Sequence, residues 1–185
     1  MKKYKTILAD PPWDYEGMGK RHKGRSPRKL PSDVYECMTM NELYQLPVTN
    51  LTDDSAHLYL WFTNAFSHEA HHLMESWGFR PITIITWVKD RIGVGWYLRG
   101  QTEHILFGVR GSLLTKRNDI STVFHADRLK HSQKPDIFYE IIEKMSYEPR
   151  LELFARQKRK GWDSIGFDID GCDIRESLDK LVTLY

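Results

Sequence analysis

TILADPPW, residues 6–13, joins a short apolar run to a stiff turn. The apolar run predicts a buried strand over Thr6–Asp10, and the two prolines predict that the strand ends in a loop. Pro11 disfavours helical geometry at Asp10, and neither proline has a backbone N–H group. We therefore expect a rigid turn that displays the Asp10 carboxylate, free proline carbonyl oxygens and the Trp13 indole together at one strand end.

The rest of the chain alternates between strand and helix patterns. Nearly continuous apolar runs predict strands over 57–62, 82–88, 103–109 and 151–155, with 164–169 as a further candidate. Helices are predicted over 39–46, 66–77, 135–145 and 175–184, the first with a Thr39–Glu42 capping box and the second ended by Gly78. This alternation predicts an α/β fold with a mostly parallel sheet, in which ligands bind at the carboxyl ends of strands.

Composition narrows the classes of protein that the chain can belong to. The chain has 185 residues, of which 41% are hydrophobic and 28% charged, so we expect one globular domain over 1–185 with a C-terminal helix or tail over 171–185. No apolar run is long enough for a membrane span, and the N-terminus lacks the apolar core of a secretory signal. Two cysteines make neither a disulfide framework nor a zinc motif, so a cytoplasmic location is expected.

The turn after Asp10 carries the groups that methylation of a nucleobase amine requires. An exocyclic amine is a poor nucleophile because its lone pair is delocalised into the ring. Two acceptors on its hydrogens, here the Asp10 carboxylate and the Pro11 carbonyl, would hold the nitrogen closer to tetrahedral and direct the lone pair. An aromatic face such as Trp13 would stack on the extruded base. A rigid loop with a core tryptophan is the simpler alternative.

Over most of its length the chain resembles the methyltransferase-A type (METTL-like) adenine N6-methyltransferases, in their bacterial or phage branch. The segments that carry the resemblance are ADPPWDY, PSDVYECMTMNEL, HLYLWFTN, GVGWYLRGQTEHILFGVRG, HSQKPDIFYEIIEKMS and RLELFARQKRKGWDSIGFDID. The resemblance implies a Rossmann-like methyltransferase fold in permuted order, in which the catalytic DPPW strand precedes the cofactor-binding strand. It also implies S-adenosylmethionine as the methyl donor, without a metal.

The resemblance assigns roles to individual positions. It implies that Asp10, Pro11, Pro12 and Trp13 hold the target amine and the methionine end of the cofactor. It implies further cofactor contacts from Lys134, Arg156, Gln157, Arg159 and Asp168, and substrate contacts from Tyr15 and Tyr35. The chain departs from the family at Phe167, where an asparagine is expected, and at Lys158-Arg159, where some members have His-Asn. Phenylalanine cannot hydrogen-bond to ribose, which puts part of that contact in doubt.

Basic segments predict contacts with a nucleic acid, since the formal net charge of only +2 gives no general affinity. The glycine-rich segment 17–30 includes Lys20, Arg21 and Arg25 and contains no acid, which suits contacts with phosphates. The segment 93–100 adds Trp96 and Arg99 for stacking and phosphate contact. DNA is favoured over RNA because the compact chain lacks the accessory domains of RNA-modifying relatives. The sequence leaves open whether a second copy of the chain or a partner subunit is needed.

Three other functions compete with this hypothesis. The first is an RNA adenosine N6-methyltransferase, which has the same chemistry on another polymer. The second is a non-catalytic nucleic-acid-binding partner of an active enzyme, which only Phe167 supports. A third alternative comes from His68-Glu69-Ala70-His71-His72, which fits the H-E-x-x-H zinc hydrolase motif on a predicted helix. No third ligand follows that motif at a useful spacing, so a polar helix face is the simpler explanation.

Overall fold

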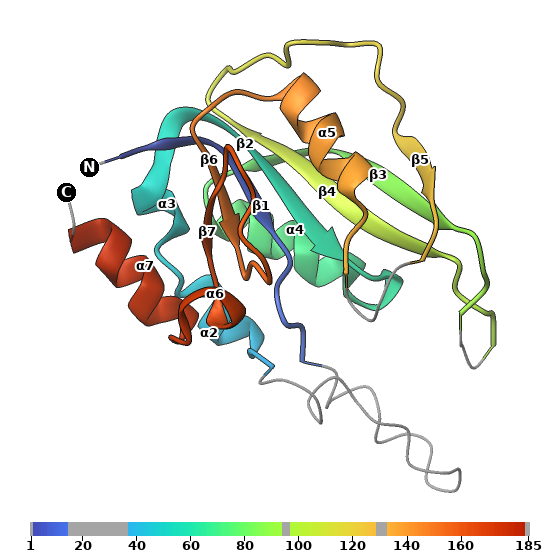
Figure 1. The fold of residues 1–185 in the computed structure, drawn as a ribbon, viewed down its shortest axis with the longest axis horizontal. Coiled ribbons are helices and arrows are strands. Elements are labelled where there is room, and N and C mark those ends of the chain that lie inside the picture. Colours follow the sequence, from blue (N-terminus) through green and yellow to red (C-terminus); the bar gives the residue numbers. More distant parts are fainter. Residues whose placement is uncertain (1, 15–36, 94–96, 129–132, 184–185) are drawn as a thin grey trace, which may run out of the picture.

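The computed structural model of the chain describes residues 2–14, 37–93, 97–128 and 133–183. Seven strands form one sheet in the order β5-β3-β4-β2-β1-β6-β7 (Figure 1). Their bounds are β1 Tyr4–Ala9, β2 Thr52–Phe62, β3 Arg80–Lys89, β4 Thr102–Arg110, β5 Val123–Ala126, β6 Arg150–Leu153 and β7 Asp163–Ile165. Strand β2 lies at the centre, and β1 is next to it, parallel to both of its neighbours, β2 and β6.

Helices cover both faces of the sheet, as Figure 1 shows for α4 and α5. The helices are α2 Met40–Tyr44, α3 Val48–Leu51, α4 Ser67–Ser76, α5 Asp136–Met145, α6 Phe167–Asp170 and α7 Ile174–Thr183, with a 3-10 turn, η2, over Asn64–Phe66. Alternate residues of each central strand point to opposite faces, so Ile7 and Leu58 join a core with α2, α4 and α7. Leu8 and Tyr59 join the second core, with α5.

The sheet is parallel in four of its pairings and antiparallel in two. β1–β2, β1–β6, β6–β7 and β3–β5 are parallel, whereas β4 runs antiparallel to β2 and β3. The reversal of β4 matters for the site. Because β4 points the other way, its first residues lie at the sheet edge where β1 and β2 end, as the pairing of Phe62 with His104 shows. Glu103 is thereby brought to the same edge as Asp10.

Most of the predicted elements are confirmed, with shifts of a few residues. Helix α2 has the expected capping box, with Thr39 as N-cap and Glu42 as its partner. Helix α4 ends just before Gly78, which has a positive φ of 81°. The candidate strand 164–169 is corrected: β7 stops at Ile165, and α6 follows because the chain turns at Gly166. Strand β5 and helix α3 were not predicted, since neither segment has a long apolar pattern.

No helix among residues 2–14, 37–93, 97–128 and 133–183 combines the length and the apolar character needed to cross a membrane.

The close packing of α4 on the sheet depends on Gly108 in β4. A Cβ atom at this position would collide with Met74 Sδ and lie 3.2 Å from the Arg80 carbonyl oxygen. We predict that Gly108→Ala lowers the free energy of unfolding by about 1–3 kcal/mol, the usual cost of overpacking a core. Urea denaturation monitored by circular dichroism measures this change.

Gly100→Ala is the matched control, because nothing lies within 4 Å of a Cβ atom added there. We expect a change within about 0.5 kcal/mol, as for an exposed substitution. Equal effects of the two substitutions would show that α4 does not rely on the missing side chain of Gly108.

Candidate active site

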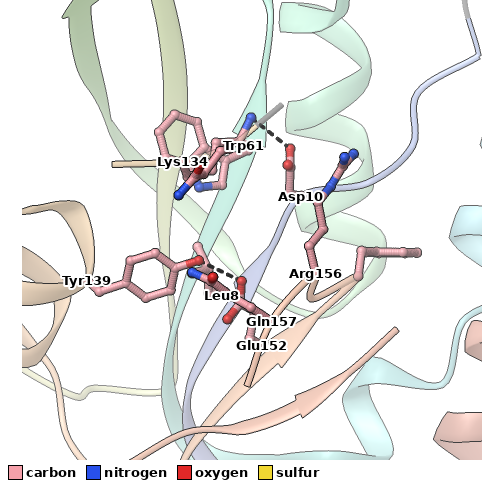
Figure 2. Close-up of a pocket in the computed structure, with 10 residues that line it drawn as sticks. Leu8, Asp10, Trp61, Lys134, Tyr139, Glu152, Arg156 and Gln157 are labelled. Carbon is pink, nitrogen blue, oxygen red and sulfur yellow. Dashed lines mark hydrogen bonds and ion pairs between the residues drawn. The ribbon is translucent and has the colours of Figure 1, made fainter. Parts of the chain in front are cut away.

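A pocket of about 250 Å³ opens at the carboxyl ends of β1 and β6. Figure 2 shows side chains from several elements converging on it. They come from β1, β2, the segment before α5, α5 itself, and β6 with the residues that follow it. The lining residues are Leu8, Asp10, Trp61, Gln133, Lys134, Tyr139, Glu152, Phe154, Arg156 and Gln157. This is the edge at which open α/β sheets bind ligands.

Lys134 bridges two carboxylates at one end of the pocket, and Figure 2 shows its ion pair with one of them, Asp10. Its ammonium lies 3.2 Å from Asp10 Oδ1 and 2.9 Å from Glu103 Oε2. Glu103 also accepts a hydrogen bond from Lys89 at 2.5 Å, and Lys134 lies over the Trp61 ring, 4.5 Å from its centre. The charges therefore alternate in a row from Lys89 through Glu103 and Lys134 to Asp10.

These contacts set the protonation of each group. Burial raises the pKa of Asp10 above its ordinary value, although Lys134 opposes this change. Burial also favours the neutral form of Glu103, but Lys134 and Lys89 outweigh it and lower the pKa of Glu103. Burial alone would lower the pKa of Lys134, yet its attraction to Asp10 and Glu103 raises that pKa. Lys134 is therefore held in its positively charged form, whereas Asp10 beside it takes up a proton more readily than an ordinary aspartate.

At the other end of the pocket lies a second cluster of polar side chains, separate from the first. Tyr139 donates a hydrogen bond of 2.7 Å to Glu152 Oε1. The Arg159 guanidinium stacks on the Tyr139 ring at 3.7 Å and pairs with Asp136 at 2.6 Å. Burial raises the pKa of Glu152 to about 7, well above that of an exposed glutamate.

The chain enters a strained turn directly after β6. Phe154, which lines the pocket, has a φ of 61°, a value that costs energy for a residue with a bulky side chain. This turn directs Arg156 and Gln157 toward the pocket, as Figure 2 shows. Strain of this kind is found where the surrounding fold holds a site in place.

The structure brings four of the six expected cofactor residues together. Asp10, Lys134, Arg156 and Gln157 line the pocket. Arg159 lies behind Tyr139 instead of in the lining, because its guanidinium is held by that ring and by Asp136. Asp168 is exposed on α6, beside Phe167, which is 73% exposed.

Several expected substrate residues lie outside the part of the chain that the structure describes. They are Tyr15, Lys20, Arg21, Arg25, Tyr35 and Trp96, together with the rest of segment 17–30. Arg99 is described and exposed, and it donates a hydrogen bond to the Gly93 carbonyl oxygen at 2.8 Å. Arg99 lies in the loop between β3 and β4.

The DPPW turn differs from expectation in two respects. Its carbonyl oxygens are engaged: Pro11 accepts a hydrogen bond from the Trp13 N–H, and Pro12 accepts one from Met38, both at 2.9 Å. A carbonyl oxygen has two lone pairs, so Pro11 can still accept a second hydrogen bond. Trp13 is 5% exposed, stacks on Phe66 and donates its indole N–H to Trp61, which makes it a core residue instead of an exposed stacking surface.

Glu103, Tyr139 and Glu152 are the site residues that sequence reasoning missed. Glu103 and Glu152 sit within apolar runs that predict strands, and Tyr139 is part of the apolar face of α5. The sequence feature that could have identified them is a polar side chain inside a segment predicted to be buried, because such side chains are rarely buried without a partner.

The two histidines of the H-E-x-x-H motif do share one face of α4. Their Nε2 atoms are 3.1 Å apart, and both side chains are exposed. Among the residues that the structure describes, no group of three His, Cys, Asp or Glu side chains could hold a metal ion. The geometry therefore gives the zinc hydrolase hypothesis no support.

We predict that Lys134→Met destabilises the protein by about 1–3 kcal/mol at neutral pH, because Asp10 and Glu103 lose the cation between them. The loss should shrink as pH falls, because Asp10 and Glu103 then take up protons and no longer need the cation. Thermal denaturation from neutral to acidic pH measures both effects.

Lys144→Met serves as the control for loss of a lysine. Lys144 is exposed on α5 and lies 4.0 Å from Glu140, so its removal should cost at most about 0.5 kcal/mol. A Lys134→Met protein as stable as wild type would contradict the bridging role.

Comparison with known proteins places this site in a family. A model of the MT-A70 family matches residues 4–168. The type II methyltransferase M.MunI of a Mycoplasma species is 33% identical over 183 residues, which cover 91% of this chain and 78% of that protein. A probable MT-A70-like N(6)-adenosine-methyltransferase of rice is 33% identical over 177 residues, 90% of this chain and 23% of that protein.

The human N(6)-adenosine-methyltransferase catalytic subunit METTL3 is 30% identical over 181 residues, 91% of this chain and 29% of that protein. This chain thus spans most of the length of M.MunI but less than a third of the two longer relatives. The family match, over residues 4–168, covers all the residues that line the pocket, among them Asp10 and Lys134. The chain belongs to the MT-A70 family of adenine N6-methyltransferases.

Proposed function

We propose that this adenine N6-methyltransferase takes its methyl group from S-adenosylmethionine and transfers it to adenine in DNA. The observation that carries the proposal is the Asp10 carboxylate, held beside Lys134 at the mouth of a pocket at a strand end. The fold would then be a Rossmann-like methyltransferase fold in permuted order. The adjacent, parallel β1 and β6 support this, since the strand with Asp10 comes first in the chain.

The residues of the pocket suit S-adenosylmethionine, which members of the family use. That molecule has a carboxylate, an ammonium group, ribose hydroxyls and an adenine ring. Lys134 and Arg156 supply positive charge, Glu152 and Asp10 supply acceptors, and Leu8, Trp61 and Phe154 supply apolar surface. S-adenosylmethionine supplies an electrophilic methyl group on a positively charged sulfur.

The role that we assign to Asp10 is to bind and orient the target amine. Its carboxylate accepts one hydrogen of the amine, and the remaining lone pair of the Pro11 carbonyl accepts the other. Lys134 keeps the carboxylate in place and offsets the burial that favours its neutral form. Trp13 acts through packing, because its hydrogen bond to Trp61 fixes the turn against β2.

The loop between β3 and β4 is the part of the described chain that best suits nucleic acid outside the pocket. Tyr97 is 94% exposed and Leu98 is 88% exposed, and Arg91 and Arg99 lie near them in the chain. Exposed aromatic and apolar side chains next to arginines suit stacking and phosphate contact.

DNA is proposed over RNA because the similarity to a type II methyltransferase extends over 78% of that enzyme. The similarity to the N(6)-adenosine-methyltransferases quoted above extends over only 23–29% of those proteins. The similar identity to those longer relatives keeps adenosine in RNA as the second candidate.

The test is transfer of a labelled methyl group from S-adenosylmethionine to DNA and RNA of matched sequence, in single- and double-stranded form. We predict that wild type labels N6-methyladenine in DNA. We predict that Asp10→Asn lowers the rate by at least about a hundredfold, since the negative charge is lost and one of the two acceptor oxygens becomes an NH2 donor. The folded state is retained, because asparagine has the same shape.

Asp54→Asn is the control, as Asp54 is exposed near the start of β2, far from the ends of β1 and β6. Its rate should equal that of wild type. Label in RNA alone would show that the substrate is the second candidate, adenosine in RNA. Unchanged turnover by Asp10→Asn would contradict the role of Asp10.

A further inference from the structure

Glu152 is a buried carboxyl group on the floor of the pocket that the proposed mechanism does not use. It lies on β6 and is 9% exposed, opposite Leu8 of β1 and Ser164 of β7. Figure 2 shows its side chain at the end of the pocket away from Lys134, next to Tyr139. A glutamate is rarely buried unless its polar atoms have partners.

The two carboxyl oxygens of Glu152 have different surroundings. Oε1 accepts the hydrogen bond from Tyr139, whereas Oε2 is buried and has no hydrogen-bond partner among the residues that the structure describes. The hydroxyl of Ser164, its neighbour on β7, is likewise buried and unpartnered within those residues. An unpartnered buried polar atom is costly, and Glu152 lines the pocket, so a small rotation of its carboxyl group lets a ligand donate a hydrogen bond to Oε2.

The charged and titratable groups around Glu152 come from each element that packs against it. Helix α5 contributes Tyr139, the segment after β6 contributes Arg159, and the turn after β1 contributes Asp10. Burial raises the pKa of Glu152 to about 7, the hydrogen bond from Tyr139 and the charge of Arg159 lower it, and Asp10 raises it. Close to neutral pH, therefore, a hydrogen bond gained or lost at Oε2 decides whether Glu152 carries a proton.

We propose that Glu152 is the proton-linked acceptor of the cofactor site, whose Oε2 accepts a hydrogen bond from the cofactor and whose proton leaves when the cofactor binds. This inference rests on the proposed function, because it takes the pocket to be the site of S-adenosylmethionine. A carboxylate that accepts bonds on both oxygens, from Tyr139 and from the ligand, is stabilised in its ionised form. Binding and proton release are then linked.

The linkage has a definite sign. A ligand that binds only the ionised form loses affinity as pH falls through the pKa of the free site. With that pKa near 7, the affinity should fall about tenfold between pH 8 and pH 6. A ligand that instead offered an acceptor to Glu152 would bind more tightly at low pH.

The experiment is calorimetric titration of the full chain with S-adenosylhomocysteine from pH 5.5 to 8.5. Wild type should show the tenfold loss at low pH, and at pH 7 the heat of binding should depend on the ionisation enthalpy of the buffer, which reports released protons. Glu152→Gln cannot ionise, so its affinity should be nearly independent of pH over this range.

Tyr139→Phe is the second variant, and it keeps the proposal testable if Glu152→Gln does not fold. Loss of the donor on Oε1 should move the midpoint of the pH dependence upward. Glu140→Gln, an exposed substitution on α5, should leave the midpoint unchanged. Repeating the titration with 5′-methylthioadenosine, which has the ribose hydroxyls but no ammonium group, identifies the donor. A retained pH dependence assigns it to the adenosine part, a ribose hydroxyl or the adenine amine, and a lost one assigns it to the ammonium.

Equal pH dependence in wild type and Glu152→Gln would overturn the inference and leave the proposed function intact. Tighter binding at low pH would also overturn it, since the ligand would then be an acceptor. Absence of binding by folded wild type at every pH would instead refute the proposed cofactor site.

Discussion

One lysine organises the edge of the sheet at which we place the chemistry. Lys134 lies between Asp10 and Glu103, and its ammonium lies over the Trp61 ring. Without this cation, two carboxylates would face each other in a partly buried site, which is strongly unfavourable. The ionised carboxylate of Asp10, which we assign to the target amine, is therefore stabilised by Lys134.

The topology explains how these three residues meet. Asp10 follows β1, Lys134 precedes α5, and Glu103 is the second residue of β4, so they are far apart in the chain. Parallel pairing puts the ends of β1, β2 and β6 at one edge, and the reversal of β4 adds its first residues to that edge. The strained turn at Phe154 then directs the chain after β6 back over the pocket.

Local sequence patterns predicted the residues at element ends better than those inside elements. Asp10 was found because two prolines mark the strand end, whereas Lys134 was assigned through the resemblance to the family. Glu103 was missed because the direction of β4 cannot be read from its apolar run. Trp13 was assigned to stacking because its burial against Phe66 depends on α4 and β2, which lie far away in the sequence. The end of β7 was misplaced because a short apolar run fits both a strand and a helical turn.

We assign a role to each end of the pocket. The end at Asp10 holds the reacting groups, and the end at Glu152 and Tyr139 binds the cofactor. The crystal structure of the protein with S-adenosylhomocysteine bound tests this claim most directly. The account predicts that the sulfur lies beside Asp10 and that a donor of the ligand reaches Glu152 Oε2. Electron density for the ligand outside this pocket, or with its sulfur away from Asp10, would contradict it.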